Sequence, residues 1–468
     1  MNIKNAVLKV FSANVIQLIS NLIIGFLVPK IMTIDGYANL KTYTLYISYI
    51  GFLHLGFPDG LFIKYGGMKY YNIDKGILKG EHNFLVIFQF IISIVFFIIA
   101  LYLKNILIFL VSISILPIMI QCFHKNIAQA TGEFDKYSKI MYIYNITYLF
   151  LNILLAIIFK NTNYIFYCLT TFGANLISVF IFEIKFLKEN IKYKAVYNKK
   201  NIINSIKVGF LIMLGNLIVV GLFGLDKIFV KIFLSTEEFA YYSFAVSMLN
   251  IINVLISAIS ITFYNYLCLN NYKESINKLK KYFLIIGGFA SSAYFILEFI
   301  INNFLIKYTN SLNITAITFS VFPYMIVINS LYLNLYKVDK NEKKYIKIVL
   351  LIFSISIIYN FIAICLFKNT ESIAFATLFT LITWIVISTY DLKNVDFEIS
   401  DFLYTIILTI SFIFSTMYIK GYKGLIIYML TFISFTIIFY KKILIKLKEE
   451  FLSVFKRKWK NEENRINR

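Results

Sequence analysis

Apolar residues dominate this chain in long runs that recur from Val7 to Leu447. Each run holds about 20 residues, the length that an α-helix needs to cross the roughly 30 Å hydrocarbon core of a bilayer. The runs fall at residues 7–30, 40–62, 84–103, 106–124, 139–159, 164–184, 206–234, 239–263, 282–305, 315–336, 347–367, 372–390, 402–419 and 424–445. They predict an all-α, polytopic membrane protein of about 14 transmembrane helices, because a lipid-facing backbone must satisfy its own polar groups.

Positive charge is distributed unevenly between the turns that join these runs. Most of the 46 Lys and Arg residues fall in alternate turns, above all around the segment 185–207 and in the tail beyond residue 441. Cytoplasmic turns collect Lys and Arg, so we expect both termini to lie in the cytoplasm. The net charge of +22 then reflects topology and attraction to anionic lipids, and we expect no nucleic acid as a partner.

The composition agrees with a membrane protein and limits the chemistry. Hydrophobic residues make up 59% and charged residues 15% of the chain, and the mean hydropathy is +0.76. The four cysteines lack CxxC spacing, which argues against disulfides and zinc sites. His54, His82 and His124 are the only histidines, and we interpret His54 as a hydrogen-bonded group between helices. The sequence therefore predicts no metal site, no cofactor and no enzymatic activity.

The runs divide into two halves that begin alike. A Lys-Val pair at residues 9–10 opens the first long run, and another at residues 207–208 opens the seventh. Six runs in each half give both halves the same orientation, as in repeats related by a pseudo-two-fold axis along the membrane normal. We expect an N-lobe, a basic cytoplasmic linker, a C-lobe, two extra spans and a basic cytoplasmic tail, at residues 1–187, 188–204, 205–391, 392–447 and 448–468.

Polar residues within the runs recur at helical spacing. Asn14, Gln17 and Asn21 share one face of the first run, and Asn250 and Asn253 belong to a similar face of the eighth. Such stripes can serve close packing and hydrogen bonds between helices. They can equally line a wet cavity between two lobes, and the sequence leaves both interpretations open.

Ionisable residues near membrane depth are costly and therefore informative. Lys64, Lys227 and Lys231 are candidate cations for a substrate cavity, whereas Asp226, Asp59 and Glu298 are candidate carboxylates for ion coupling. An ion pair of Asp226 with Lys227 at the outer headgroup level is the alternative for that pair.

Two stretches resemble a known family. Residues 55–67, LGFPDGLFIKYGG, and the pair Asp226-Lys227 followed by residues 239–245, FAYYSFA, are similar to the bacterial Wzx-like polysaccharide flippases of the MOP exporter superfamily. The resemblance implies two six-helix lobes around a cationic cavity. It also implies a lipid-linked oligosaccharide cargo, of O-antigen or capsule type, carried on undecaprenyl pyrophosphate across the cytoplasmic membrane. Lys64 stands where that family usually has Arg, which keeps the charge but loses bidentate phosphate geometry.

Two alternatives remain open. One is another cation-coupled exporter of the same architecture, and the other is a membrane polysaccharide polymerase or acyltransferase. Short outer turns and the lack of a Gly-rich phosphate loop, a nucleophile elbow or an HExxH motif argue against an enzyme. Without a nucleotide-binding motif, transport should be driven by a Na⁺ or H⁺ gradient. Partners are then the lipid-linked cargo, membrane lipids and polysaccharide-assembly proteins.

Overall fold

The chain is helical throughout the part that its computed structural model describes, residues 3–269, 276–338, 342–392, 395 and 397–466. In parts of α10 and α19, and at the N-terminus, only the backbone is described. The helices form two compact units: residues 1–254 with 364–370, and residues 255–363 with 371–468. The all-α fold predicted from the apolar runs is confirmed.

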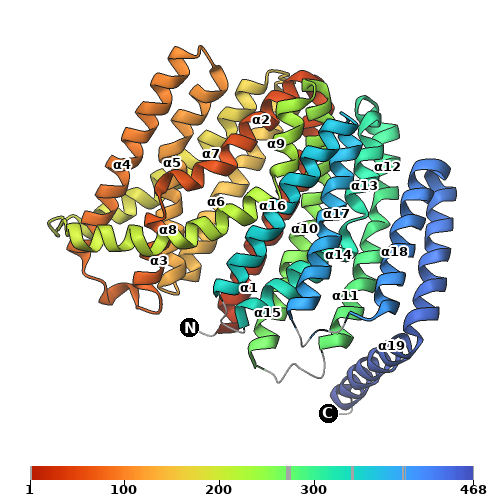
Figure 1. The fold of residues 1–468 in the computed structure, drawn as a ribbon. Helices are drawn as coiled ribbons and strands as arrows, with labels where there is room; N and C mark the ends of the chain where they lie inside the picture. The colour runs from red at the N-terminus through yellow and green to blue at the C-terminus, as the bar shows by residue number, and fades with distance from the viewer. Residues whose placement is uncertain (1–2, 270–275, 339–341, 393–394, 396, 467–468) are drawn as a thin grey trace. The chain divides into compact units, whose positions relative to one another are not determined.

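The helices of the first unit lie mostly alongside one another (Figure 1). In chain order they are α1 Ile3–Ile31, α2 Ile34–Ile50, η1 Gly51–His54, α3 Phe57–Tyr65, η2 Tyr70–Asn72, α4 Lys75–Tyr102, α5 Ile106–Ala130, α6 Phe134–Ile153, η3 Leu154–Ile158, α7 Tyr164–Asn190, α8 Lys199–Leu222 and α9 Leu225–Phe233. The next helix, α10 Thr236–Leu269, begins in this unit and continues into the second.

The second unit contains the remaining helices, several of them broken. They are α11 Ile276–Ser291, α12 Ala293–Phe304, η5 Ile306–Ser311, α13 Leu312–Phe319, α14 Phe322–Val327, η6 Ile328–Tyr332, α15 Leu333–Val338, α16 Glu342–Leu366, α17 Thr370–Asp391, α18 Ile399–Phe414, η7 Ser415–Ile419 and α19 Gly421–Ile466. The last residues of α16 belong to the first unit.

Eleven helices among the described residues are long and apolar enough to cross a membrane, and a bent pair, Ile306–Phe319 and Phe322–Tyr336, makes a twelfth. Two of the fourteen predicted runs, 40–62 and 239–263, are not among these twelve. The first is divided, because the left-handed residues Leu55 and Gly56, with φ of 50° and 78°, separate η1 from α3. The second lies in α10. The protein is therefore a multi-pass membrane protein, and the count of fourteen stays a prediction.

Polar turns end the helices where the apolar runs break. Lys104 takes a left-handed φ of 50°, and Asn105 then caps α5 by accepting a hydrogen bond from the backbone N–H of Leu107 at 2.9 Å. Asp74 caps α4 in the same way, from the N–H of Gly76 at 2.8 Å. These oxygens satisfy the first backbone donors of each helix, which have no partner within it.

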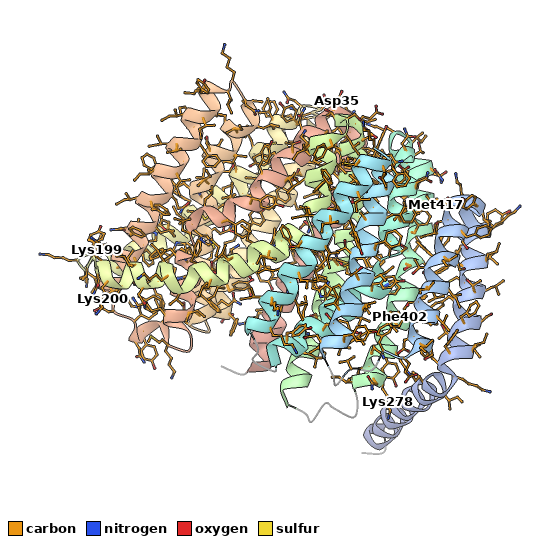
Figure 2. The ribbon with its side chains drawn as sticks, in the orientation of Figure 1. Asp35, Lys199, Lys200, Lys278, Phe402 and Met417 are labelled. Atoms are coloured by element: carbon orange, nitrogen blue, oxygen red, sulfur yellow. The ribbon has the colours of Figure 1, made fainter. Side chains whose placement is uncertain are left out.

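Lysines also mark helix ends at the surface. Lys199 and Lys200, at the start of α8, are exposed and project away from the neighbouring helices (Figure 2). Their helix lies nearly crosswise to α4, α5 and α7 (Figure 1). The basic segment of the sequence therefore leads directly into a helix with an unusual direction.

Three glycines allow α8 to cross α3 at backbone contact. A Cβ atom added to Gly209 on α8 would lie 1.9 Å from the carbonyl oxygen of Gly56. One added to Gly60 on α3 would lie 1.9 Å from the carbonyl oxygen of Ser205. Small residues four apart on each helix permit such close approach between membrane helices. The glycines of the LGFPDG stretch thus have a packing role.

A buried ion pair joins three helices of the second unit. The ammonium of Lys280, on α11, lies 2.5 Å from a carboxylate oxygen of Asp401, on α18, and both side chains are fully buried. The hydroxyl of Tyr440 donates to the other oxygen of Asp401 at 2.8 Å. Tyr440 has φ of −129° and ψ of 25° inside α19, and the helix bends there (Figure 1).

The α3–α8 crossing generates the first prediction. Gly209→Ala should force the two backbones apart and lower the free energy of unfolding by about 1–3 kcal/mol, the usual cost of overpacking. Gly215→Ala is the matched control on the same helix, because a Cβ there meets nothing within 4 Å. Thermal unfolding in detergent measures both. Equal midpoints for the two variants would contradict the close contact.

Candidate functional site

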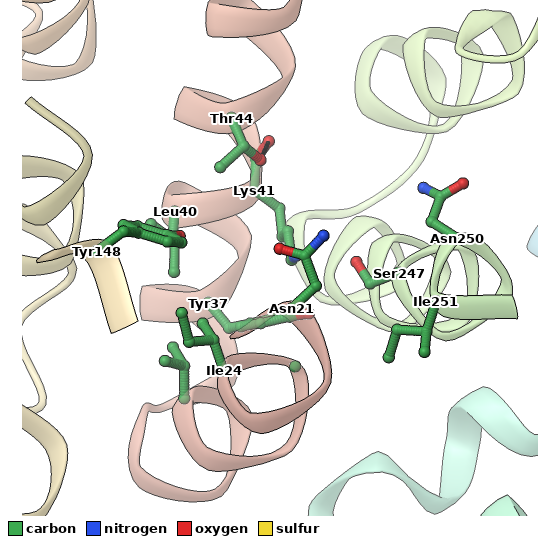
Figure 3. A pocket seen from close by; sticks show the side chains of 12 residues that line it. Asn21, Ile24, Tyr37, Leu40, Lys41, Thr44, Tyr148, Ser247, Asn250 and Ile251 are labelled. Carbon is green, nitrogen blue, oxygen red and sulfur yellow. Dashed lines mark hydrogen bonds between the residues drawn. The ribbon is translucent and has the colours of Figure 1, made fainter. Parts of the chain in front are cut away.

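A polar cavity of about 190 Å³ lies within the first unit, between the α1–α2 hairpin, α6 and α10. Its lining residues are Asn21, Ile24, Gly25, Val28, Tyr37, Leu40, Lys41, Thr44, Tyr148, Ser247, Asn250 and Ile251. Figure 3 shows Asn21 and Lys41 extending into it from the hairpin, with Ser247 and Asn250 facing them from α10. The cavity therefore combines one cation with amide and hydroxyl groups.

The hairpin that holds these groups is fixed by local contacts. Thr33 caps α2 by accepting a hydrogen bond from the N–H of Gly36 at 3.1 Å. Tyr37, 1% exposed, packs edge-to-face on Phe244 of α10, with ring centroids 6.4 Å apart. The absence of a side chain at Gly25 lets Met248 approach within 3.3 Å of its Cβ position. These contacts hold α10 against the hairpin and set the width of the cavity.

Lys41 is the cation of this cavity. Its ammonium lies 5.1 Å from the ring centroid of Tyr37, within range of a cation–π interaction. Among the described side chains no carboxylate pairs with it. A cation among amide and hydroxyl groups can bind an anionic group.

Lys41 was not identified from the sequence. The predicted run begins at residue 40, next to this lysine, and no role was assigned to it. In the structure α2 begins at Ile34, which places Lys41 two turns inside the helix. The signal that could have identified it is the single charge between the aromatic residues Tyr37 and Tyr43, on a helix in which six apolar or aromatic residues follow it.

The predicted polar stripes contribute in part to the cavity. Asn21 and Asn250 line it. The amide of Asn253 lies 3.4 Å from the amide oxygen of Asn250, one turn further along α10. Asn14 and Gln17 are partly exposed on α1 and do not line the cavity. Whether any of these residues binds substrate stays a prediction.

Lys64 does not line this cavity. Its ammonium lies 2.5 Å from one carboxylate oxygen of Glu81, and the hydroxyl of Tyr65 donates to the other at 2.5 Å. The carboxylate of Glu81 is 2% exposed, whereas the side chain of Lys64 is 29% exposed. The charge that the sequence assigned to pyrophosphate is therefore compensated within the protein, and Glu81 was not identified from the sequence.

The candidate residues on α9 are held by local hydrogen bonds. Asp226 is buried and accepts from the hydroxyl of Tyr242 at 2.8 Å and from the N–H of Lys227 at 2.7 Å. The ammonium of Lys231 lies 5.0 Å from the ring centroid of Phe239. The structure thus brings Asp226 into contact with Tyr242 of the FAYYSFA stretch. The sequence alone does not show that these two motifs touch.

The other two candidate carboxylates lie in different surroundings. Asp59 is partly buried, with a carboxylate oxygen 3.8 Å from Nε2 of His54. His54 itself accepts a hydrogen bond from the N–H of Gly56 through Nδ1 at 3.0 Å. Glu298, in the second unit, accepts from the N–H of Gly421 at 3.0 and 3.1 Å and so caps α19. An ion-coupling role of either carboxylate stays a prediction.

Comparison with known proteins identifies the fold. The lipid II flippase MurJ, in an inward closed conformation, matches with a TM-score of 0.69 and 15% identity over 94% of this chain and 99% of that chain. Two MATE structures match less well. One, in complex with Br-NRF, has a TM-score of 0.42 and 11% identity over 85% of this chain and 93% of that one. An outward-facing MATE transporter of the MOP superfamily has a TM-score of 0.47 and 9% identity over 87% and 96%.

No protein-family model matches the sequence, and no curated protein does. The structural match with MurJ nevertheless extends over nearly the whole of both chains. The chain therefore has the fold of this solved flippase structure.

Proposed function

We propose that this protein is a flippase that moves an undecaprenyl-pyrophosphate-linked oligosaccharide from the inner to the outer leaflet of a bacterial cytoplasmic membrane. Lys41 is the observation that carries the proposal, since it places a cation without a carboxylate partner among the described side chains in a cavity that amide and hydroxyl groups also line. The MurJ fold supports it, because the flippase of that name has a lipid-linked molecule as its cargo.

The chemistry of the cavity suits such a headgroup. A pyrophosphate cannot cross hydrocarbon unaided, because it would lose the water that hydrates its charges. A lysine that contacts the phosphates partly replaces that water and lowers the free-energy cost of crossing. Charge-assisted hydrogen bonds to phosphate are about twice as strong as neutral ones. Asn21, Asn250 and Ser247 add donors and acceptors for hydroxyl groups, and Tyr148 adds an aromatic surface for a sugar ring.

The size of the cavity limits what it holds at one time. Its volume of about 190 Å³ is below the roughly 300–1,000 Å³ of pockets that enclose drug-sized ligands. We infer that it receives the pyrophosphate and the first sugar, while the remaining sugars occupy a wider path in another conformation. That path would open by alternating access between the two predicted lobes, residues 1–187 and 205–391, with both termini in the cytoplasm.

Lys41 provides the direct test. Lys41→Ala should reduce transport about 10-fold or more, because a hydrogen bond to a charged group contributes about 1.5–3 kcal/mol. Lys41→Arg should retain transport, and Lys199→Ala, at an exposed helix start, is the control. The assay measures the appearance of lipid-linked oligosaccharide on the far leaflet of proteoliposomes.

Two results would count against this function. Unchanged transport by Lys41→Ala would show that the lysine of this cavity does not bind the cargo during transport. Export of cationic drugs by the wild-type protein, with no movement of the lipid-linked sugar, would instead favour an exporter of the same fold.

Lys64 requires a separate experiment. If it pairs with Glu81 for stability, Lys64→Ala should lower the free energy of unfolding by about 2 kcal/mol. This is less than the 3–5 kcal/mol of a fully buried pair, because Lys64 is partly exposed. Lys64→Ala with Glu81→Gln should recover most of the loss. Normal thermal stability in Lys64→Ala together with lost transport would show that Lys64 meets the cargo.

Asp226 is the proposed site of ion coupling. One charge moved through 100 mV supplies about 2.3 kcal/mol, more than a tenfold bias toward release. Asp226→Asn retains one oxygen that can accept from Tyr242 and loses the acceptor that faces the N–H of Lys227. We expect that transport by this variant no longer responds to an imposed Na⁺ or H⁺ gradient. Tyr242→Phe is the control for loss of that hydrogen bond alone. Full gradient dependence in Asp226→Asn would make Asp226 a structural residue.

A further inference from the structure

Three helices of the first unit bring two histidines and a glutamate together. His82 lies on α4, His124 on α5 and Glu183 on α7. Nε2 of His82 is 3.1 Å from a carboxylate oxygen of Glu183, and Nε2 of His124 is 2.9 Å from Oε2 of the same group. One potential ligand atom from each residue lies within 4.8 Å of the other two. This cluster could not be identified from the sequence, because its residues are 42 and 59 positions apart.

The spacing of these atoms suits a metal ion. Zinc bonds to histidine nitrogen and carboxylate oxygen at about 2.0–2.1 Å, so neighbouring ligands on a tetrahedron lie about 3.3 Å apart. The two observed separations, 3.1 and 2.9 Å, are within a few tenths of an ångström of that value. A bound ion would replace the two contacts of Nε2 with the carboxylate, and each neutral imidazole would then carry its ring proton on Nδ1.

The surroundings hold both imidazoles in place. The ring of His82 lies 5.1 Å from that of Phe123 and 4.7 Å from that of Phe186, and the ring of His124 lies 5.6 Å from Phe186. Both histidine side chains are almost fully buried, at 3% and 2% exposure. An aromatic wall of this kind fixes the planes of the two imidazole rings.

Metal binding also requires a particular tautomer of each imidazole. When Nε2 binds a metal, the ring proton lies on Nδ1 and needs an acceptor, which in metal sites is commonly a carbonyl or carboxylate. Nδ1 of His82 lies 3.4 Å from the amide oxygen of Asn83. The side chain of Glu183 is 20% exposed, so the cluster remains open on one side for entry of the ion and for a water ligand.

We propose that His82, His124 and Glu183 form a binding site for a divalent transition-metal ion, with zinc the best fit. Two imidazoles and one carboxylate are ligands for zinc and its first-row neighbours, whereas calcium and magnesium prefer oxygen alone. Three protein ligands leave one position for water. The ion would join α4, α5 and α7, and it is separate from the Na⁺ or H⁺ proposed to act at Asp226.

Metal titration of the purified full-length protein tests the site. The protein should carry an affinity tag without histidines, and chelator should remove bound metal first. We expect Co²⁺ to produce the visible absorption of a four- or five-coordinate ion that saturates at one equivalent, and Zn²⁺ to abolish it. Zn²⁺ should also raise the unfolding temperature. A wild-type protein that gives no saturable band and no thermal shift would overturn the proposal.

Variants locate the ion. Glu183→Gln and His124→Gln should each weaken Zn²⁺ binding about 100-fold or more, since loss of a contact in the outer shell alone costs 10–100-fold. His54→Gln is the matched control, because His54 is the remaining histidine and is not part of the cluster. Unchanged stoichiometric binding in a His82→Gln, His124→Gln double variant would overturn the proposal, because the ion would then lie elsewhere. Chelator titration of the wild-type protein provides the affinity even if a variant fails to fold.

Discussion

An ionisable group at membrane depth needs a partner, and this constraint organises both units of the protein. Leaving a charge uncompensated in an apolar environment costs several kcal/mol. Five buried or partly buried carboxylates meet the constraint through contacts within their own unit: Glu81 with Lys64 and Tyr65, Glu183 with His82 and His124, Asp226 with Tyr242, Glu298 with the backbone of Gly421, and Asp401 with Lys280 and Tyr440. Lys41 differs from these groups, because no carboxylate pairs with it among the described side chains. This difference is the reason for assigning it a role in binding cargo.

The two roles of charge can therefore be separated by geometry. Lys64 and Lys41 are both lysines on short helices of the first unit, and from sequence Lys64 was the better candidate because it lies in a recognisable motif. Its ammonium is nevertheless within 2.5 Å of a buried carboxylate, whereas Lys41 faces amides, hydroxyls and aromatic rings. A cation that is already paired contributes to stability, and an unpaired one is available to an anionic cargo.

Most of the fold could be predicted from the sequence, because long apolar runs at membrane length have few alternatives to the helix. The positions at which helices break were harder to predict. The run 40–62 contains Gly56 and Pro58, which permit a left-handed residue and a new helix start, yet its hydropathy alone does not reveal the division into α2, η1 and α3. Helical spacing placed Asn21 and Asn250 on polar faces, and both line the cavity.

The partners in the site could not be predicted in this way. Glu81 pairs with Lys64 across 17 residues, and Glu183 meets histidines that are 59 and 101 residues away. Such contacts depend on which helices pack against each other. The periodicity of a single sequence shows which face of a helix is polar, but it does not show which helices are neighbours. The position of Lys41 was missed for a simpler reason, since the start of α2 lies six residues before the predicted run.

The ion pair of Lys280 with Asp401 shows whether the second unit could fold without the last two predicted spans. The sequence suggested that the last two spans, within residues 392–447, are additions to a twelve-helix core. Asp401 and Tyr440, however, both belong to this segment, and they contribute to the complete burial of the Lys280 ammonium. A protein shortened to the twelve-helix core would keep Lys280 and lose these two partners, so the terminal helices are an integral part of the second unit's interior.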